Sequence, residues 1–218
     1  FFTTDLTVAN TGGEDVAATI QFLGNNQEGR AGPSKTVSLP AGKTVSYRDV
    51  LAALFGVSED WGALRISANS ASLAIHGQTS TPGPTGGTYG QSVPASGSKD
   101  LIRNGLQHII TGIREDVSSR TNLILANATD QPLDVDVRLL SSSGLELGAR
   151  LVPLPPLGMT QLTQVARLLG VDQGLETGQL IVSTPTPGGS FAAYAALIDN
   201  VTNDPRTLTA QWRTAEFP

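Results

Sequence analysis

Apolar and polar residues alternate along most of the chain. Residues 5–8 read polar, apolar, polar, apolar, and residues 134–139 repeat this alternation three times. Because successive side chains of a β-strand point to opposite faces, a period of two predicts strands with one buried face. Clusters of turn-forming residues separate the apolar runs, among them NTGGED, GNNQEG and LPAGK. This spacing of short strands and turns predicts an antiparallel all-β sandwich.

The amino-acid sequence contains an internal repeat. The phrase TTDLTVAN at 3–10 returns as RTNLILAN at 120–127, and three further segments match in the same order. The further matches are VSLPAGKTVSYRDVLAALFGV with VPLPPLGMTQLTQVARLLGV, GALRISA with GQLIVST, and SLAIHGQTS with SFAAYAALI. A repeat of this length indicates one structural unit present twice. We therefore expect two tandem homologous Ig-like β-sandwich domains, residues 1–95 and residues 105–218, joined by a linker at 96–104.

One segment of each repeat has helical spacing instead. YRDVLAALFG (residues 47–56) and TQVARLLG (residues 163–170) place apolar residues one turn apart. Each segment ends in a glycine, which suits the left-handed cap of a helix. We expect one short helix in each repeat, closing one end of the core.

The segment between the repeats predicts further strands. TYGQSVPA (residues 88–95) reads as the last strand of the first repeat, and residues 101–119 read as a strand or hairpin leading into the second. The counterpart of that leader in the first repeat would precede residue 1, and the chain opens on Phe1 rather than Met. We expect a module cut from a longer polypeptide, whose first repeat lacks its leading strand.

Composition narrows the classes of function. The 218 residues carry a net charge of -5, only 15% are charged, and there is no cysteine. No basic face is available to bind nucleic acid or an anionic membrane. Disulfides, zinc–thiolate sites and thiol nucleophiles are excluded. No run approaches the roughly 18 apolar residues that span a bilayer, so no membrane insertion is expected.

The residues that catalysis needs do not form a recognisable pattern. His76 and His108 are the only histidines, and no G-x-S-x-G motif accompanies them. Asp134 and Asp136 fall on a polar strand face, where paired carboxylates of a glycosidase are not expected. The glycine-rich GPTGGTYGQ lacks the Lys-Ser/Thr of a phosphate loop. We expect that the chain is not an enzyme.

Two candidate binding sites remain, one for carbohydrate and one for calcium, and each has a purely structural alternative. Carbohydrate modules use exposed aromatic rings, for which Trp61, Tyr89 and Trp212 are the candidates, although packing in a core is the favoured interpretation of each. Calcium prefers hard oxygen ligands, which the segment DNVTNDP supplies, although such residues also form turns without metal. The calcium candidates are Asp199, Asn200, Asn203 and Asp204. No cofactor beyond this ion is expected.

Several phrases together resemble a family of tandem repeat domains. These are RTNLILAN, the LPAG turn before a short helix, GTYGQSVPA and IDNVTNDP. In their combined order they are similar to uncharacterised tandem Ig-like β-sandwich repeats of secreted or cell-surface bacterial proteins. That resemblance implies an Ig-like fold and an extracellular or cell-surface location, and it brings no catalytic residues.

Three functions follow as expectations. The first is a non-catalytic structural or adhesive module, whose partners are other domains of its parent protein or a neighbouring subunit. The second is an accessory module that binds carbohydrate or calcium. The third is a self-assembling fibre or surface subunit that a strand from a neighbour completes, since an open sheet edge accepts an added strand.

Overall fold

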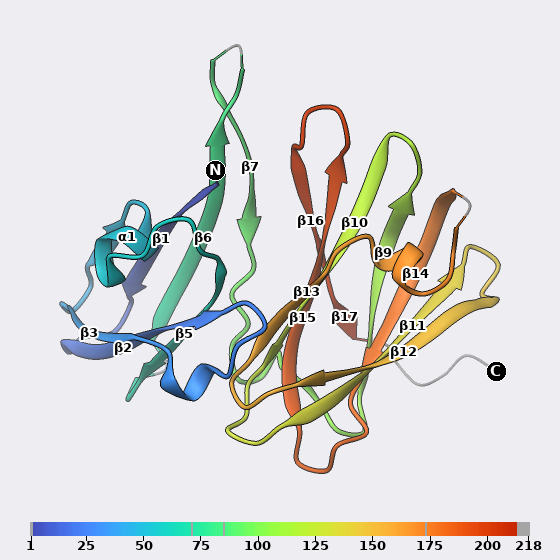
Figure 1. Ribbon diagram of the computed structural model, residues 1–218. Coiled ribbons are helices and arrows are strands. Elements are labelled where there is room, and N and C mark those ends of the chain that lie inside the picture. Colours follow the sequence, from blue (N-terminus) through green and yellow to red (C-terminus); the bar gives the residue numbers. More distant parts are fainter. Residues whose placement is uncertain (1, 71, 85, 173, 213–218) are drawn as a thin grey trace.

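The chain folds into antiparallel β-sheets with two short α-helices, which confirms the predicted all-β class. The computed structural model describes residues 2–70, 72–84, 86–172 and 174–212. None of the helices in these ranges is long and apolar enough to cross a membrane. In Figure 1 the strands of residues 3–93 lie on one side of the molecule and those of residues 102–212 on the other. We call these the N-terminal half and the C-terminal half, and their division into two domains stays a prediction.

The N-terminal half consists of two sheets. Its elements are β1 (Thr3–Asn10), β2 (Val16–Gly24), the 3₁₀ turn η1 (Gly29–Ala31), β3 (Ser34–Leu39), β4 (Thr44–Tyr47), α1 (Val50–Phe55), β5 (Gly62–Ala68), β6 (Leu73–Pro82) and β7 (Thr88–Val93). One sheet has the order β4-β1-β6-β7 and the other has the order β3-β2-β5. All neighbouring strands in both sheets are antiparallel.

The C-terminal half repeats this plan and adds strands to it. Its elements are β8 (Ile102–Arg103), β9 (Gln107–Glu115), β10 (Ser119–Asn127), β11 (Leu133–Ser141), β12 (Glu146–Leu154), β13 (Met159–Leu162), α2 (Val165–Leu168), β14 (Leu175–Ser183), β15 (Ser190–Asp199), β16 (Pro205–Thr209) and β17 (Gln211–Trp212). One sheet runs β13-β10-β15-β16, with β8 also paired to β15, and the other runs β12-β11-β14-β9-β17. The predicted leader is therefore β9, and residues 102–103 of the predicted linker belong to a sheet.

The sequence repeat corresponds to a repeat in topology. Under the alignment, β1 to β7 match β10 to β16 in chain order, and the shared strands have the same neighbours in both halves. The C-terminal half differs by having β9 and β17 beyond β14, and β8 beside β15. No described residue of the N-terminal half occupies the place of β9 next to β5.

A buried asparagine fixes the first turn of each half in the same way. Asn10 donates from Nδ2 to the carbonyls of Glu14 (2.7 Å) and Leu39 (2.9 Å), and its Oδ1 accepts the amide of Gly12. Asn127 makes the matching bonds to Gln131 (2.8 Å) and Pro155 (2.9 Å), and its Oδ1 accepts the amide of Thr129. Both side chains are almost fully buried. The repeated Asn is therefore a structural turn residue, since buried backbone groups must be satisfied.

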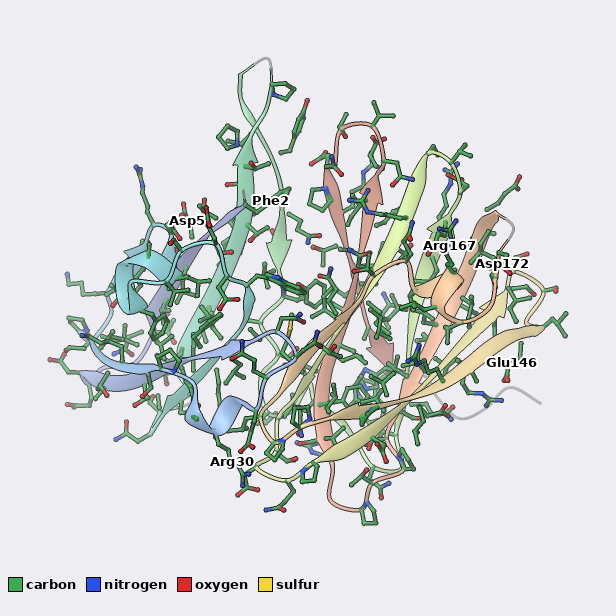
Figure 2. All side chains as sticks on the ribbon, in the orientation of Figure 1. Phe2, Asp5, Arg30, Glu146, Arg167 and Asp172 are labelled. Atoms are coloured by element: carbon green, nitrogen blue, oxygen red, sulfur yellow. The ribbon has the colours of Figure 1, made fainter. Side chains whose placement is uncertain are left out.

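Each helix is also entered in the same way. The residue before each helix, Asp49 or Gln164, has a left-handed backbone with φ of 44° or 54°. The amide of Asp49 bonds to Asp5 Oδ1 (3.0 Å), just as the amide of Gln164 bonds to Asn122 Oδ1 (3.1 Å). Figure 2 shows Asp5 near the start of β1, facing the α1 region. A glycine with positive φ follows each helix, as predicted from the sequence.

Candidate functional site

The N-terminal and C-terminal halves are in direct contact with each other. The loop after β2 reaches the turn before β13, where the amide of Asn26 donates to the Met159 carbonyl (2.7 Å). The amide of Gly29 donates to the Pro156 carbonyl (3.0 Å) in the same region. A Cβ added at Gly29 would lie 2.0 Å from the Leu157 carbonyl oxygen, so only glycine fits there. The two backbones are therefore in direct contact.

Side chains extend this contact over the adjoining strands. Asn25 Oδ1 accepts the amide of Gln161 (3.2 Å), and the Thr160 hydroxyl donates to Asn26 Oδ1. At the start of β5, Ala63 packs against a small apolar cluster of the C-terminal half. The cluster consists of Ile124, Met159 and Ala196, with Ala126, Tyr194 and Ile198 partly buried against them. Burial raises the pKa of Tyr194 to about 12, as expected for a phenol held away from water.

A second line of contact joins β7 to β16. The amide of Gly90 donates to Asp204 Oδ1 (3.2 Å), and the Thr207 hydroxyl donates to Gln91 Oε1 (3.2 Å). In Figure 1 these two edge strands face each other across the middle of the molecule. With two separate lines of contact, rotation of one half against the other requires several hydrogen bonds to break together.

The four predicted calcium ligands lie together in the hairpin between β15 and β16. Asp199 Oδ1 accepts the amides of Val201 and Thr202, both at 2.8 Å. Those amides, with the Thr202 amide contributing most, lower the pKa of Asp199. The Oδ1 atom of Asp199 is thus already used by hydrogen bonds within the turn. This is the alternative that the sequence also offered, a turn formed without metal.

The other candidate ligands are held by a guanidinium and an amide. Arg120 donates to Asn200 Oδ1 (2.7 Å) and to Asn203 Oδ1 (2.9 Å), while Asp204 Oδ1 accepts from Gly90. Across the described ranges no group of three or more His, Cys, Asp or Glu side chains could hold a metal ion. A calcium ion in this loop stays a prediction, and binding would have to displace Arg120.

The three aromatic candidates are placed on separate elements. Trp61 precedes β5 and is 41% exposed, and Trp212 lies in β17 and is 58% exposed. Tyr89 lies near the start of β7, where its ring is close to Gly83 in the turn of the same hairpin. Neither of the ring contacts recorded for the described residues joins two of these three side chains. A shared aromatic platform for a sugar is therefore not formed, and contact with a ligand stays a prediction for each ring.

His108 is a core residue of β9 that is covered by Trp212. The two rings lie 5.4 Å apart, and only 3% of His108 is exposed. Burial lowers the pKa of His108. Its Nε2 atom has no hydrogen-bond partner among the described residues. A catalytic histidine needs access to substrate, and Trp212 and the core leave this imidazole almost none.

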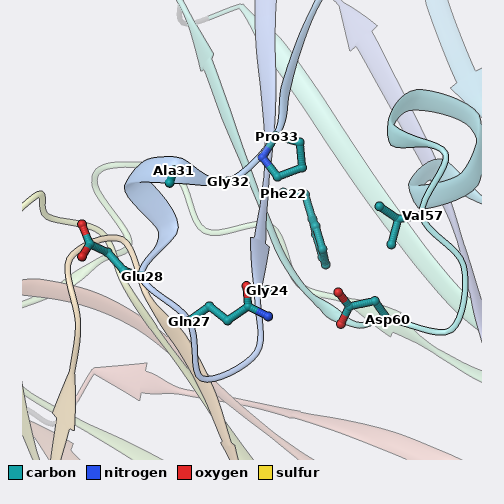
Figure 3. Close-up of a pocket in the computed structure, with 9 residues that line it drawn as sticks. All are labelled: Phe22, Gly24, Gln27, Glu28, Ala31, Gly32, Pro33, Val57 and Asp60. Carbon is teal, nitrogen blue, oxygen red and sulfur yellow. The ribbon is translucent and has the colours of Figure 1, made fainter.

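One hollow lies beside the contact between the halves. Figure 3 shows the Phe22 ring between Pro33 and Val57, with the Asp60 carboxyl near the end of the ring. The volume of this hollow is about 220 Å³, which is below the range of roughly 300–1,000 Å³ that is usual for small-molecule pockets. Asp60 Oδ1 already accepts the amide of Trp61 (2.7 Å). A shallower hollow lies beside the β9–β10 hairpin, where Arg114 forms an ion pair with Asp116.

The sequence does not mark the loop after β2 as a contact. GNNQEG predicts only a turn, because Gly and Asn favour turns wherever they occur. The available signal was the difference in length between the repeats, since SSSG occupies the matching place in the second. A longer loop in one repeat indicates a role that the other lacks.

Comparison of the chain with protein-family models, with curated proteins and with solved structures gives no match.

Proposed function

We propose that this chain is a non-catalytic structural or adhesive module, a rigid pair of β units that fixes the spacing of its neighbours in a larger secreted or cell-surface bacterial protein. The observation that supports the proposal is the close approach at Gly29, where backbone meets backbone. Halves that contact each other through long side chains can re-pack, whereas a glycine packed against a carbonyl permits one arrangement only.

The surface chemistry is consistent with a passive role. Turn carboxylates and amides are used within their own loops, as in the bonds of Asp199 and Asn200. The ion pairs Arg30–Glu28 and Arg138–Glu146 join neighbouring side chains at the surface. Figure 2 shows Arg30 at the lower side of the molecule in that view. A surface of this kind is suited to spacing and support.

A distance measurement across the contact tests the proposal. Because the chain has no cysteine, Lys35→Cys and Leu145→Cys would place one spin label on an exposed site in each half. A rigid module gives a single narrow distance distribution by pulsed electron resonance. Gly29→Val should broaden that distribution, since the added side chain cannot coexist with the Leu157 carbonyl.

Gly13→Val is the matched control for this experiment. A Cβ at Gly13 meets nothing within 4 Å, so this variant should leave the distribution narrow. A broad distribution in the unsubstituted chain would contradict a spacing function. An equal broadening by both glycine variants would show that the Gly29 contact does not hold the halves together.

A further inference from the structure

The two halves meet through segments that do not correspond in the repeat. The N-terminal half contributes the loop of residues 25–33, and the C-terminal half contributes the turn of residues 155–158. Figure 1 shows the loop that carries η1 beside the turn between β12 and β13. The counterparts of these segments, residues 141–144 and residues 40–43, are largely exposed. A contact between different surfaces of homologous units is head-to-tail rather than symmetric.

Turn 155–158 has a backbone that suits glycine but holds a leucine. In both repeats the amide of the fourth turn residue donates to the carbonyl of the first, at 3.1 Å in residues 40–43 and at 2.9 Å in residues 155–158. The third residue has positive φ in both turns, 65° at Gly42 and 47° at Leu157. A leucine in this conformation brings its Cβ close to a carbonyl oxygen, which is unfavourable. The cost indicates that the side chain of Leu157 makes a compensating contribution.

Leu157 is buried outside the apolar clusters of its own half. Only 6% of Leu157 is exposed, and neither apolar cluster described for the C-terminal half includes it. Its carbonyl carbon lies 2.8 Å from the point that a Cβ on Gly29 would occupy. Gly42 at the matching position is exposed, and a Cβ added there would meet nothing within 4 Å. The burial of Leu157 therefore belongs to the place where loop 25–33 covers the turn.

Leu23 has the same property in the N-terminal half. The alternation along β2 places Leu23 on the outer face of its sheet with Ala17 and Gln21, yet only 4% of Leu23 is exposed. Its Cδ2 atom lies 2.8 Å from the same point beside Gly29. The repeat counterpart of Leu23 is Leu140, which lies on the outer face of β11 and is partly exposed. Leu23 is thus covered where loop 25–33 meets turn 155–158.

We propose that Leu23 and Leu157 specify how the two halves dock, through a head-to-tail contact that each half makes on one side only. This rests on the proposed function, because a spacer needs a contact that forms in one arrangement. Leu157 supplies an apolar side chain on a turn, and Gly29 permits the close approach of the loop that covers it. On the opposite sides, Gly42 has no side chain to offer, and the short SSSG turn follows Leu140 in place of the longer loop.

Hydrogen exchange at the contact tests this role in the full chain. The amides of Asn26 and Gly29 bond to carbonyls of the C-terminal half, so their exchange reports opening of the contact. Leu157→Ala should raise both exchange rates by roughly tenfold or more, because it truncates a buried leucine. Amides of β14, which lies away from the contact, serve as the internal reference. Absence of protection at both contact amides in the unsubstituted chain would contradict the proposal.

Leu157→Gly separates an anchoring side chain from a leucine that is merely tolerated. Glycine adopts positive φ without steric cost, so this substitution relieves the backbone of the turn. If the side chain anchors the contact, exchange at Asn26 and Gly29 still rises. Unchanged or slower exchange at these two amides would overturn the proposal, since the leucine would then contribute only strain.

The repeat supplies matched controls for both leucines. Leu23→Ala should raise exchange at the contact amides, whereas Leu140→Ala should not, because Leu140 occupies the matching position outside the contact. Gly42→Ala should lower the temperature of thermal unfolding, since alanine is strained at φ of 65°, and should leave the contact amides unchanged. Equal effects of Leu23→Ala and Leu140→Ala on those amides would count against a one-sided contact.

The double variant of Leu23→Ala and Leu157→Ala tests whether the two side chains act together. Its effect on exchange should be smaller than the product of the single effects, because the second truncation removes less once the contact is weakened. A full product would mean that the two leucines act independently, and the proposed pair would fail. Unchanged contact amides together with a narrow label distribution would contradict this pair alone, whereas a broad distribution in the unsubstituted chain would contradict the spacing function.

Discussion

The two halves have the same local structure but not the same degree of burial. Their turns agree hydrogen bond for hydrogen bond, as the pairs Asn10 with Asn127 and Asp5 with Asn122 show. Their cores differ, since Leu180 is fully buried where Leu64 is not. The turns depend on a few side-chain bonds that both halves make, whereas the core of the C-terminal half also depends on β9, which no described strand of the N-terminal half matches. Local similarity therefore does not guarantee equal stability.

The largest expected effect comes from truncating one core residue in each half. Phe191 is 0% exposed, and its repeat partner Leu73 is partly exposed. Phe191→Ala should cost about 3–5 kcal/mol of unfolding free energy, whereas Leu73→Ala should cost about 1–2 kcal/mol. Denaturant unfolding, with hydrogen exchange to assign each half, measures both. Equal costs would show that the difference in burial between the halves does not produce a difference in stability.

Substitution of Asn10 and of Asn127 should instead lower the unfolding free energy by similar amounts. Asn127→Ala and Asn10→Ala each leave two carbonyls and one amide without their partner in a buried turn. Each should cost about 1–3 kcal/mol, the penalty for unsatisfied buried groups. The same unfolding measurements apply, with Asn→Asp variants as a check that the side-chain oxygen alone does not suffice. A large difference between the two sites would mean that the turns are not equivalent.

Substitution of Thr121 and of Thr4, which match in the repeat, should lower the stability by different amounts. Thr121→Val removes both bonds to the backbone of Arg114 and should cost about 1–2 kcal/mol. Thr4→Val should cost less, because the Thr4 hydroxyl contacts one partly exposed threonine. Thermal unfolding of the two variants gives this ranking. If Thr4→Val were the more damaging change, its hydroxyl would have a structural task that the repeat does not show.

The smallest effect is a pH dependence limited to the β9–β10 hairpin. Hydrogen bonds from Ser118, and then from Arg114, lower the pKa of Asp116 to about 2. Because this value lies below the ordinary carboxyl value, the stabilisation is present above about pH 4 and is lost as the pH falls towards 2. Asp116→Asn should remove that part of the acid sensitivity, as followed by exchange at residues 114–119. No described residue of the N-terminal half takes the place of Asp116, and amides of that half away from Glu28, whose pKa its bond to Arg30 also lowers, serve as the internal reference.

Much of this architecture could be predicted from the alternation and the repeat. Both helices, the strand in residues 88–95 and the strand in the leader lie where the sequence indicates. These elements have strong periodicity or clear glycine boundaries, so local signals suffice. The grouping of the calcium candidates in one hairpin also follows from their closeness in sequence.

The contacts that depend on distant partners could not be predicted. β17 has two residues, too few for a period to be visible, and β8 lies in a segment rich in Gly and Ser. The bond between the Gly29 amide and Pro156 joins residues that no local pattern connects. The different neighbours of β5 and β14 became visible only when the strand orders of the two halves could be compared.

The short β17 also determines how the chain responds to mechanical load. A pull applied through Thr3 and Trp212 meets very different resistance at its two points of attachment. β1 is paired with β4 and β6, so its two ladders must slide together before it can leave. β17 is held to β9 through Gln211 and Trp212, and it can peel away one pair at a time. Because Trp212 lies over His108, the first event under tension would expose a buried imidazole to water.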